Sequence, residues 1–317
     1  MKINKNAVVI GATGYVGSAI VKGLIENDGI ASIKCTSRDV QKAQWLKDLV
    51  GTSNSNNKVV EVVPLQLSDS NSNESNEKTI HELKEIMIGT DMVFFCAGYE
   101  EQSPSTIDFM VSNAGAVIEA AKATESVTVV VLTSSGGSTN PIDIQDSTPK
   151  SELLHFSDPT EQIKRGRYSP AAKTLMEITS MQAIGRNHKN EIINQELAFH
   201  TSTPRLIIIN PNLILGPQLD PSRQITGNSL PWMIQILKKK TMSNYIPNDS
   251  MSIIDIRDLA KLHIAAAFNE QASGRYFGVQ QSYTWKEILT EFQTILSSNS
   301  NSNSNSNSNS NSNSNSN

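Results

Sequence analysis

The feature that most constrains the fold is a glycine-spaced turn close to the start of the chain. The apolar run Ala7–Ile10 leads directly into the sequence GATGYVG, and apolar residues at helical spacing follow from Ser18 to Ile25. Glycines allow a tight turn and a close backbone approach to a ligand, and the N-terminus of the next helix favours an anion. A buried strand, such a turn and a helix together form a site for the pyrophosphate of a dinucleotide. The predicted cofactor-binding residues of this turn are Gly11, Ala12, Thr13, Gly14, Tyr15, Val16 and Gly17.

Strand-like and helical segments alternate through the first two-thirds of the chain. The strand-like runs are continuous apolar stretches, which is typical of a parallel sheet with both faces covered by helices. The predicted fold is therefore α/β, a Rossmann doubly wound parallel sheet with a smaller C-terminal substrate lobe. The predicted strands are 7–10, 32–36, 59–63, 92–97, 128–133 and 206–209, and clear helical patterns cover 106–123 and 173–186.

The sequence predicts three parts along the chain. Residues 1–216 form the NAD(P)-binding domain and residues 217–296 form the substrate lobe. Residues 297–317 alternate Ser and Asn almost without exception, offer no apolar group to bury, and are predicted to be a disordered tail. Within the lobe, Ser252–Ile256 has the pattern of a strand that rejoins the main sheet, so a strand and helix at about 252–268 are expected to return to the main domain.

Composition argues against several classes of partner. The 317 residues carry a formal net charge of −4 and a sequence pI near 5.8, so no nucleic acid partner is expected. The two cysteines, Cys35 and Cys96, fall in predicted buried strands, which is typical of a reducing compartment. No signal peptide or long apolar span is visible, and His155, His188 and His200 lack the partner spacing of metal ligands. We therefore expect a cytoplasmic protein without a membrane span or a metal site.

Four motifs occur in an order that is found in one superfamily. They are the glycine turn, TSSGG at 133–137, NPNLILGP at 210–217 and IIDIRDLAKLH at 253–263. Together they resemble the extended short-chain dehydrogenase/reductases, over nearly the whole chain up to Leu296. The resemblance is greatest to the NAD-dependent epimerase/dehydratase family and its dihydroflavonol reductase and cinnamoyl-CoA reductase branch. It implies an enzyme that binds a nicotinamide dinucleotide and transfers a hydride.

The end of the second strand bears on which dinucleotide is bound. Arg38 matches the arginine-bearing turn of NADP-binding relatives, where a guanidinium can hold the ribose 2′-phosphate. The alternatives are a loop arginine paired with Asp39, or an Asp39 that binds the 2′-hydroxyl of NAD. We predict NADP(H), with NAD(H) as the alternative. The resemblance implies further cofactor contacts at Gln66, Leu67, Ala97, Gly98, Lys173, Pro211 and Asn212.

The superfamily reduces carbonyls with a tyrosine acid, a lysine that lowers its pKa and holds the ribose, and a serine that orients the carbonyl oxygen. The matching residues are Ser135, Tyr168 and Lys173, with Ser134 as the second choice for the serine. In the family three residues separate the tyrosine from the lysine, which puts both on one helix face. Here four residues lie between Tyr168 and Lys173. On an ideal helix the extra residue turns the phenol away from the lysine face by about 100°.

A helix that begins after Tyr168 would remove this mismatch. Ser169 and Pro170 form a good helix start, with the serine as N-cap and the proline at the first helical position. Tyr168 would then precede the helix and could reach the site from the loop. The alternative is that Tyr168 is a packing or surface aromatic and that the site is catalytically degraded.

These observations predict an NADP(H)-dependent oxidoreductase that reduces a ketone or aldehyde of a small organic substrate. A nucleotide-sugar epimerase or dehydratase is one alternative, although the short region 218–247 argues against the enlarged polar lobe it needs. A non-catalytic NAD(P)-binding sensor or scaffold is the other, because of the tyrosine spacing. Substrate-selecting residues are expected in 220–232 and 244–250. The sequence leaves the oligomeric state open between a monomer and a homodimer; helices 106–123 and 173–186 correspond to those that pair two subunits in many relatives.

Overall fold

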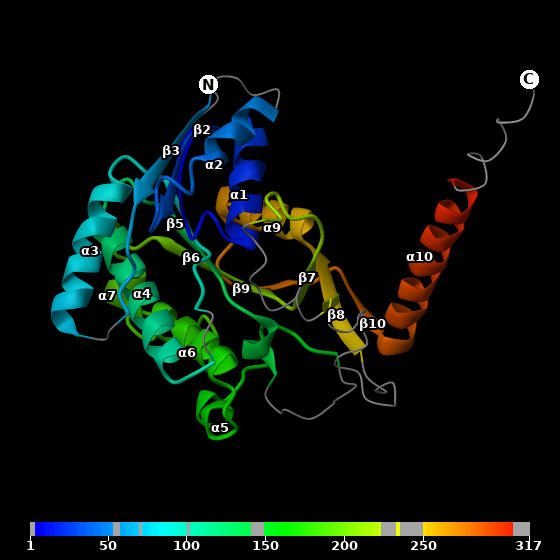
Figure 1. The fold of residues 1–317 in the computed structure, drawn as a ribbon. Coiled ribbons are helices and arrows are strands. Elements are labelled where there is room, and N and C mark those ends of the chain that lie inside the picture. Colours follow the sequence, from blue (N-terminus) through cyan, green and yellow to red (C-terminus); the bar gives the residue numbers. More distant parts are fainter. Residues whose placement is uncertain are drawn as a thin grey trace, which may run out of the picture.

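A seven-stranded parallel sheet forms the centre of the molecule (Figure 1). Its strands are β1 (Lys5–Ile10), β2 (Ile30–Ser37), β3 (Val59–Pro64), β4 (Met92–Phe95), β5 (Val129–Thr133), β6 (Arg205–Pro211) and β9 (Gly274–Gly278). They lie in the order β3-β2-β1-β4-β5-β6-β9, with every neighbouring pair parallel. The strand order reverses between β1 and β4, the switch point outside which such sheets bind ligands. The predicted doubly wound fold is confirmed. The computed structural model describes residues 4–52, 58–69, 72–99, 102–140, 149–222, 233–234 and 250–306.

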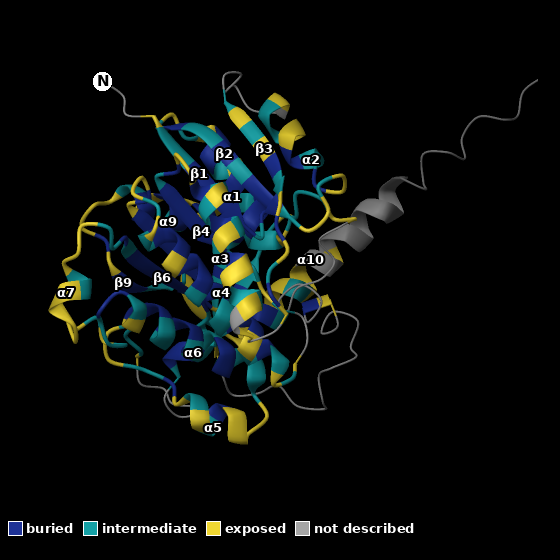
Figure 2. Ribbon diagram, turned by 90° about the vertical axis from the view of Figure 1, so that its left-hand side faces the viewer, coloured by how far each residue is buried: buried dark blue, intermediate teal, exposed yellow. Residues whose placement is uncertain are grey.

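Helices cover both faces of this sheet. Successive side chains of a strand point to opposite faces, and along β1 Ala7 and Val9 join one apolar core while Val8 and Ile10 join the other. The first core includes helices α1 (Tyr15–Glu26) and α9 (Ile256–Phe268), and the second includes α3 (Asn73–Met87), α4 (Ser105–Lys122) and α6 (Tyr168–Ala183). Figure 2 shows the central strands as a buried layer between the helices. The described residues also form α2 (Trp45–Asp48), α5 (Pro159–Lys164), α7 (Gln195–Ala198) and α10 (Trp285–Ser306), with short 3-10 turns at Leu49–Thr52 and Gly136–Thr139.

A second, smaller sheet contains β7 (Leu213–Leu215), β8 (Ser250–Asp255) and β10 (Gln281–Thr284) in the order β10-β8-β7. The prediction that Ser252–Ile256 rejoins the main sheet is therefore wrong. Met251 and Ile253 of β8 instead pack against a separate apolar cluster that includes Trp285 and Ile288. The strand that joins the main sheet late in the chain is β9, whereas the helix α9 returns as expected and packs on α1.

The end of the chain also differs from the prediction. Helix α10 continues past Leu296 to Ser306, so the first part of the Ser–Asn tail is helical rather than disordered. Extending an existing helix avoids the cost of nucleation, which allows weak helix formers such as Ser and Asn to continue it. Residues 307–317, and most of the expected substrate-selecting segments 220–232 and 244–250, lie outside the described residues. None of the helices in the described part is long and apolar enough to cross a bilayer.

Candidate active site

The glycine turn between β1 and α1 has a backbone that only glycine fits at two positions. Gly11 has φ +83°, and a Cβ there would lie 2.7 Å from the backbone nitrogen of Ala97. A Cβ on Gly17 would lie 2.2 Å from the carbonyl oxygen of Gly11. The N-cap of α1 is Gly14, so no side chain at that position satisfies the first amides of the helix. The turn is thus a cradle of backbone groups at the positive end of a helix, which fits a phosphate of a dinucleotide.

Tyr15, inside this turn, connects it to the smaller sheet. Its hydroxyl donates a hydrogen bond of 2.9 Å to the carbonyl oxygen of Gly216, which follows β7 directly. Burial, together with the nearby charge of Asp255, raises the pKa of Tyr15 to about 12, so the phenol keeps its proton. This hydrogen bond therefore connects the predicted phosphate site to the smaller sheet.

The end of β2 presents Arg38 to solvent. The alternative pairing with Asp39 is not seen, because Asp39 accepts a hydrogen bond from the Lys42 backbone nitrogen at 3.0 Å and pairs with its ammonium at 3.4 Å. These contacts hold the pKa of Asp39 below its usual value, the backbone hydrogen bond contributing most. No ion pair joins Arg38 to another residue within the described ranges. Its guanidinium is available to a ligand at the carboxyl end of β2.

The other predicted cofactor contacts lie at the same edge of the sheet. Gln66 is exposed just after β3, and Leu67 packs partly into the core. Ala97 and Gly98 follow β4, and Pro211 ends β6. The next residue, Asn212, lies beside Gly136, where a Cβ would be 3.3 Å from the Asn212 side chain. All follow strands whose carboxyl ends line one edge, which is where a doubly wound sheet holds a dinucleotide.

Lys173 reaches from α6 to the end of β5. Its ammonium donates a hydrogen bond of 2.7 Å to the carbonyl oxygen of Thr133. Burial lowers the pKa of Lys173 to about 8, only partly opposed by the electrostatic interactions with Cys96 and Glu177. Ser135 follows two residues after Thr133, and its hydroxyl oxygen accepts a hydrogen bond of 3.1 Å from the Gly137 backbone nitrogen. The lysine-bearing helix therefore contacts the end of the strand that leads to Ser135.

Helix α6 begins at Tyr168, with Arg167 as its N-cap residue. The prediction of a start at Ser169–Pro170 is therefore wrong, and Tyr168 does not precede the helix. Pro170 occupies the first turn instead, where its missing N–H costs no hydrogen bond, and its ring lies 3.1 Å from where a Cβ of Gly137 would stand. Tyr168 and Lys173, five positions apart, are about 140° apart around an ideal helix, against about 40° for the usual spacing. No hydrogen bond links the Tyr168 hydroxyl to any residue that the structure describes.

A buried carboxylate, Glu177, lies one helical turn beyond Lys173 and was missed by the sequence analysis. It is fully buried and contacts Ser134, His188, Asn210 and Arg275. Burial alone would raise its pKa, but hydrogen bonds from His188 and Ser134 and the charge of Arg275 hold that pKa below the usual value. The signal in the sequence was its position four residues after Lys173, which puts both on one helix face.

A second buried polar cluster lies under the end of β5. The hydroxyl of Thr133 is 2.9 Å from Nε2 of His263 and 3.3 Å from the sulfur of Cys96. Burial lowers the pKa of His263 to about 4 and raises that of Cys96 to about 11, so both are neutral. His263 is a packing histidine, fully buried between the Thr133 hydroxyl and the carbonyl oxygen of Leu259. The described residues contain no group of three or more His, Cys, Asp or Glu side chains placed to hold a metal.

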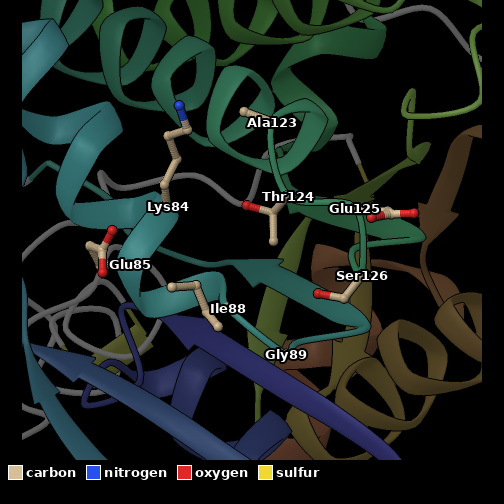
Figure 3. Close-up of a pocket in the computed structure, with 8 residues that line it drawn as sticks. All are labelled: Lys84, Glu85, Ile88, Gly89, Ala123, Thr124, Glu125 and Ser126. Carbon is tan, nitrogen blue, oxygen red and sulfur yellow. The ribbon is translucent and has the colours of Figure 1, made fainter.

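A surface depression lies at the other edge of the sheet (Figure 3). It has a volume of about 590 Å³ and lies where α3 and α4 end. Its lining residues include none of the predicted site: Lys84, Glu85, Ile88, Gly89, Ala123, Thr124, Glu125 and Ser126. The candidate active site is thus defined by its residues at the carboxyl edge rather than by this hollow.

Comparison with known proteins adds the family. A model of the 3-beta hydroxysteroid dehydrogenase/isomerase family matches residues 8–191, more than half of the chain. The chain belongs to this family. This agrees with the resemblance to extended short-chain dehydrogenase/reductases that the motif order suggested.

Relatives and solved structures extend the likeness beyond the matched range. Cinnamoyl-CoA reductase 1 of Arabidopsis thaliana is 27% identical over 282 residues, covering 86% of this chain and 69% of the relative. A cinnamoyl-CoA reductase of Medicago truncatula is 24% identical over 293 residues, covering 89% and 78%. The structure of Gre2 from Candida albicans in complex with NADPH has a TM-score of 0.68 at 20% identity, covering 90% and 81%. A UDP-N-acetylglucosamine 4-epimerase of Methanobrevibacter ruminantium has a TM-score of 0.61 at 18% identity, covering 92% and 81%. At these identities the solved structures establish the shared fold.

Proposed function

We propose that the protein is an NADP(H)-dependent oxidoreductase that reduces a ketone or aldehyde of a small organic substrate. One observation carries the proposal: a glycine cradle and the partly buried Lys173, which binds the Thr133 carbonyl two residues before Ser135, lie at the same edge of one parallel sheet. The relatives named as cinnamoyl-CoA reductases and the neighbour described with NADPH support the reaction class and the cofactor. The exposed Arg38, whose carboxylate neighbour pairs elsewhere, supports NADP over NAD.

Each residue of the proposed site has a distinct part in the reaction. The glycine turn binds the pyrophosphate and Arg38 binds the 2′-phosphate. Bound NADPH supplies the hydride that the carbonyl carbon receives. The Ser135 hydroxyl donates a hydrogen bond to the carbonyl oxygen, and the Tyr168 hydroxyl gives its proton to that oxygen as negative charge develops there. Lys173, as an ammonium, favours deprotonation of the phenol and binds the ribose.

The position of Tyr168 inside α6 favours a second candidate function. A phenol turned away from the lysine face, with no hydrogen bond to the described residues around it, suits a protein that binds the dinucleotide without reducing a substrate. Such a protein would sense the redox state of the cofactor or act as a scaffold. The two candidates share the cofactor site and differ only in chemistry.

The deciding experiment follows NADPH oxidation against a panel of aldehydes and ketones, together with NADPH binding by fluorescence. For an enzyme, we expect turnover by the wild type and a loss on the order of 10²- to 10⁴-fold in Tyr168→Phe, with NADPH affinity unchanged. Tyr276→Phe is the matched control, because its hydroxyl contacts only the backbone nitrogen of Ser273 among described hydrogen bonds, at 3.1 Å. Wild-type protein that binds NADPH but reduces nothing, while Ser169→Tyr gains turnover, would establish the non-catalytic function instead.

A further inference from the structure

We infer that Glu177 is the positioning residue for Ser135, and that its buried carboxylate holds the loop 134–138 in the shape that carbonyl recognition needs. The role of Ser135 in the reaction rests on the proposed function. The contacts that hold the loop stand independently of it.

One oxygen of Glu177 holds the beginning of the loop. Oε1 accepts hydrogen bonds from the Ser134 hydroxyl and from the Asn210 side-chain amide, the latter at 2.6 Å. The same Asn210 nitrogen also donates to the carbonyl oxygen of Ser135 at 3.0 Å. A single amide group therefore links the carboxylate to the backbone of the predicted catalytic serine.

The other oxygen holds the far end of the loop through Arg275. Oε2 lies 2.8 Å from Nε of Arg275 and 3.2 Å from Nε2 of His188. The Arg275 guanidinium then donates a hydrogen bond of 3.0 Å to the carbonyl oxygen of Ser138 and lies over the Phe156 ring at 4.5 Å. The loop is thus fastened on both sides of Ser135 by groups that meet at one carboxylate.

The charge of Glu177 is essential to this arrangement. Both Glu177 and Arg275 are buried, at 0% and 4% exposure, and a buried charge that loses its partner is strongly destabilised. An ionised carboxylate accepts hydrogen bonds at every lone pair; Ser134 and Asn210 donate to Oε1, and the Arg275 cation pairs with Oε2. A glutamine has the same size but would turn an N–H group toward one set of these partners. Glu177→Gln should therefore release the loop 134–138 without creating a cavity.

Helix α6 places Lys173 and Glu177 against two consecutive residues, Thr133 and Ser134. Lys173 binds the carbonyl of Thr133, and Glu177, one turn later, binds the side chain of Ser134. One rigid helix therefore sets both the ammonium and the serine loop against the end of β5, so their relative placement does not depend on a flexible segment.

The first test is a double-mutant cycle between Glu177→Gln and Ser135→Ala, using the reductase assay. A positioning residue acts through Ser135, so Glu177→Gln should lower kcat on the order of 10²-fold with little change in KM. In the Ser135→Ala background the same change should have less than about threefold effect, since the group being positioned is gone. Equal losses in both backgrounds would overturn the inference and leave Glu177 with a general structural role.

The second test needs no activity and uses the cofactor-free protein. Hydrogen exchange measured by mass spectrometry should accelerate in peptides covering 134–139 in Glu177→Gln, while peptides covering 8–17 exchange as in the wild type. Glu161→Gln, on the half-exposed salt bridge with Arg165, is the control and should change neither. Unchanged exchange at 134–139 would refute the inference even if turnover falls. Should wild-type protein show no turnover, the proposed function fails while this exchange result still decides whether Glu177 holds the loop.

A third variant tests the inference even if the Glu177→Gln protein does not fold. Asn210→Leu keeps the Glu177–Arg275 ion pair and removes only the amide that links the carboxylate to the Ser135 carbonyl. It should give the same faster exchange at 134–139 and the same non-additivity with Ser135→Ala. An Asn210→Leu protein with wild-type exchange and kcat would overturn the inference.

Discussion

The two halves of the candidate site lie at one edge of the same sheet but are built from different parts of the chain. At the β1–α1 turn the backbone itself forms the surface, and glycine is needed because no Cβ fits between Gly11 and its neighbours. At the β5–α6 half, side chains form the surface and a buried network around Glu177 holds them. A site made of backbone is specified by a few consecutive residues. A site made of side chains depends on helical phase and on partners far along the chain.

The strongest test of this contrast is Gly17→Ala. Its Cβ would lie 2.2 Å from the Gly11 carbonyl oxygen, so the turn must move and the phosphate cradle with it. Overpacking costs about 1–3 kcal/mol or more, and we expect NADPH affinity to fall about 100-fold by fluorescence titration. Gly115→Ala in α4 is the matched control, since nothing lies within 4 Å of its Cβ. It should raise stability by about 0.5–1 kcal/mol and leave binding unchanged. A Gly17→Ala protein with normal affinity would break the claim that the backbone forms this half.

The side-chain half makes a prediction about pH. The pKa of Lys173 is about 8 in the folded protein, against 10.5 for an ordinary lysine. Between these values the unfolded chain binds more protons than the folded one, so this group makes stability rise as pH rises. Relative to Lys173→Met, the wild type should gain on the order of 2 kcal/mol between pH 8 and pH 10.5, measured by urea unfolding. If the two proteins change in parallel across that range, Lys173 is not buried as described.

A smaller effect on NADPH affinity is expected from Arg38, which lies on the same side of the site as the β1–α1 turn. Arg38→Ala removes a charge-assisted contact to the 2′-phosphate worth about 1–2 kcal/mol, so NADPH affinity should fall about tenfold or more while NADH affinity stays the same. Isothermal titration with both dinucleotides measures the difference. Lys22→Ala, which removes an exposed cation from α1, is the control and should alter neither affinity. Equal losses for NADPH and NADH would assign Arg38 to a contact that both dinucleotides share.

The contrast also explains which features the sequence could predict. The glycine turn between a strand and a helix and the doubly wound parallel sheet follow from local patterns, and the structure contains both. The start of α6 was predicted wrongly because the preference of Ser169 and Pro170 for a helix start is weak beside packing, which places the Pro170 ring against Gly137. Local propensity gives way to tertiary contacts at such a boundary.

Long-range partners were the harder part. A glutamate in a helix usually faces solvent, and Glu177 is buried with partners that include Arg275, from a strand near the end of the chain. Strand β9 was not predicted, because its partner β6 lies far away along the chain. The apolar pattern of β8 is compatible with a strand of either sheet. Neither sheet membership nor ion pairing across that separation can be read from spacing.

The hydrogen bond from Tyr15 to Gly216 has a consequence for attempts to change what the protein acts on. Substitutions in β7 or just after it that admit a bulkier substrate would move the Gly216 carbonyl, which accepts the hydrogen bond from Tyr15. This movement would disturb the turn that is predicted to bind the dinucleotide. Engineering of the lobe and affinity for the cofactor are then not separable variables. The coupling can be tested by titrating NADPH into such redesigned proteins with Tyr15 and with Tyr15→Phe. Without the phenol hydroxyl, the redesigns should not change NADPH affinity.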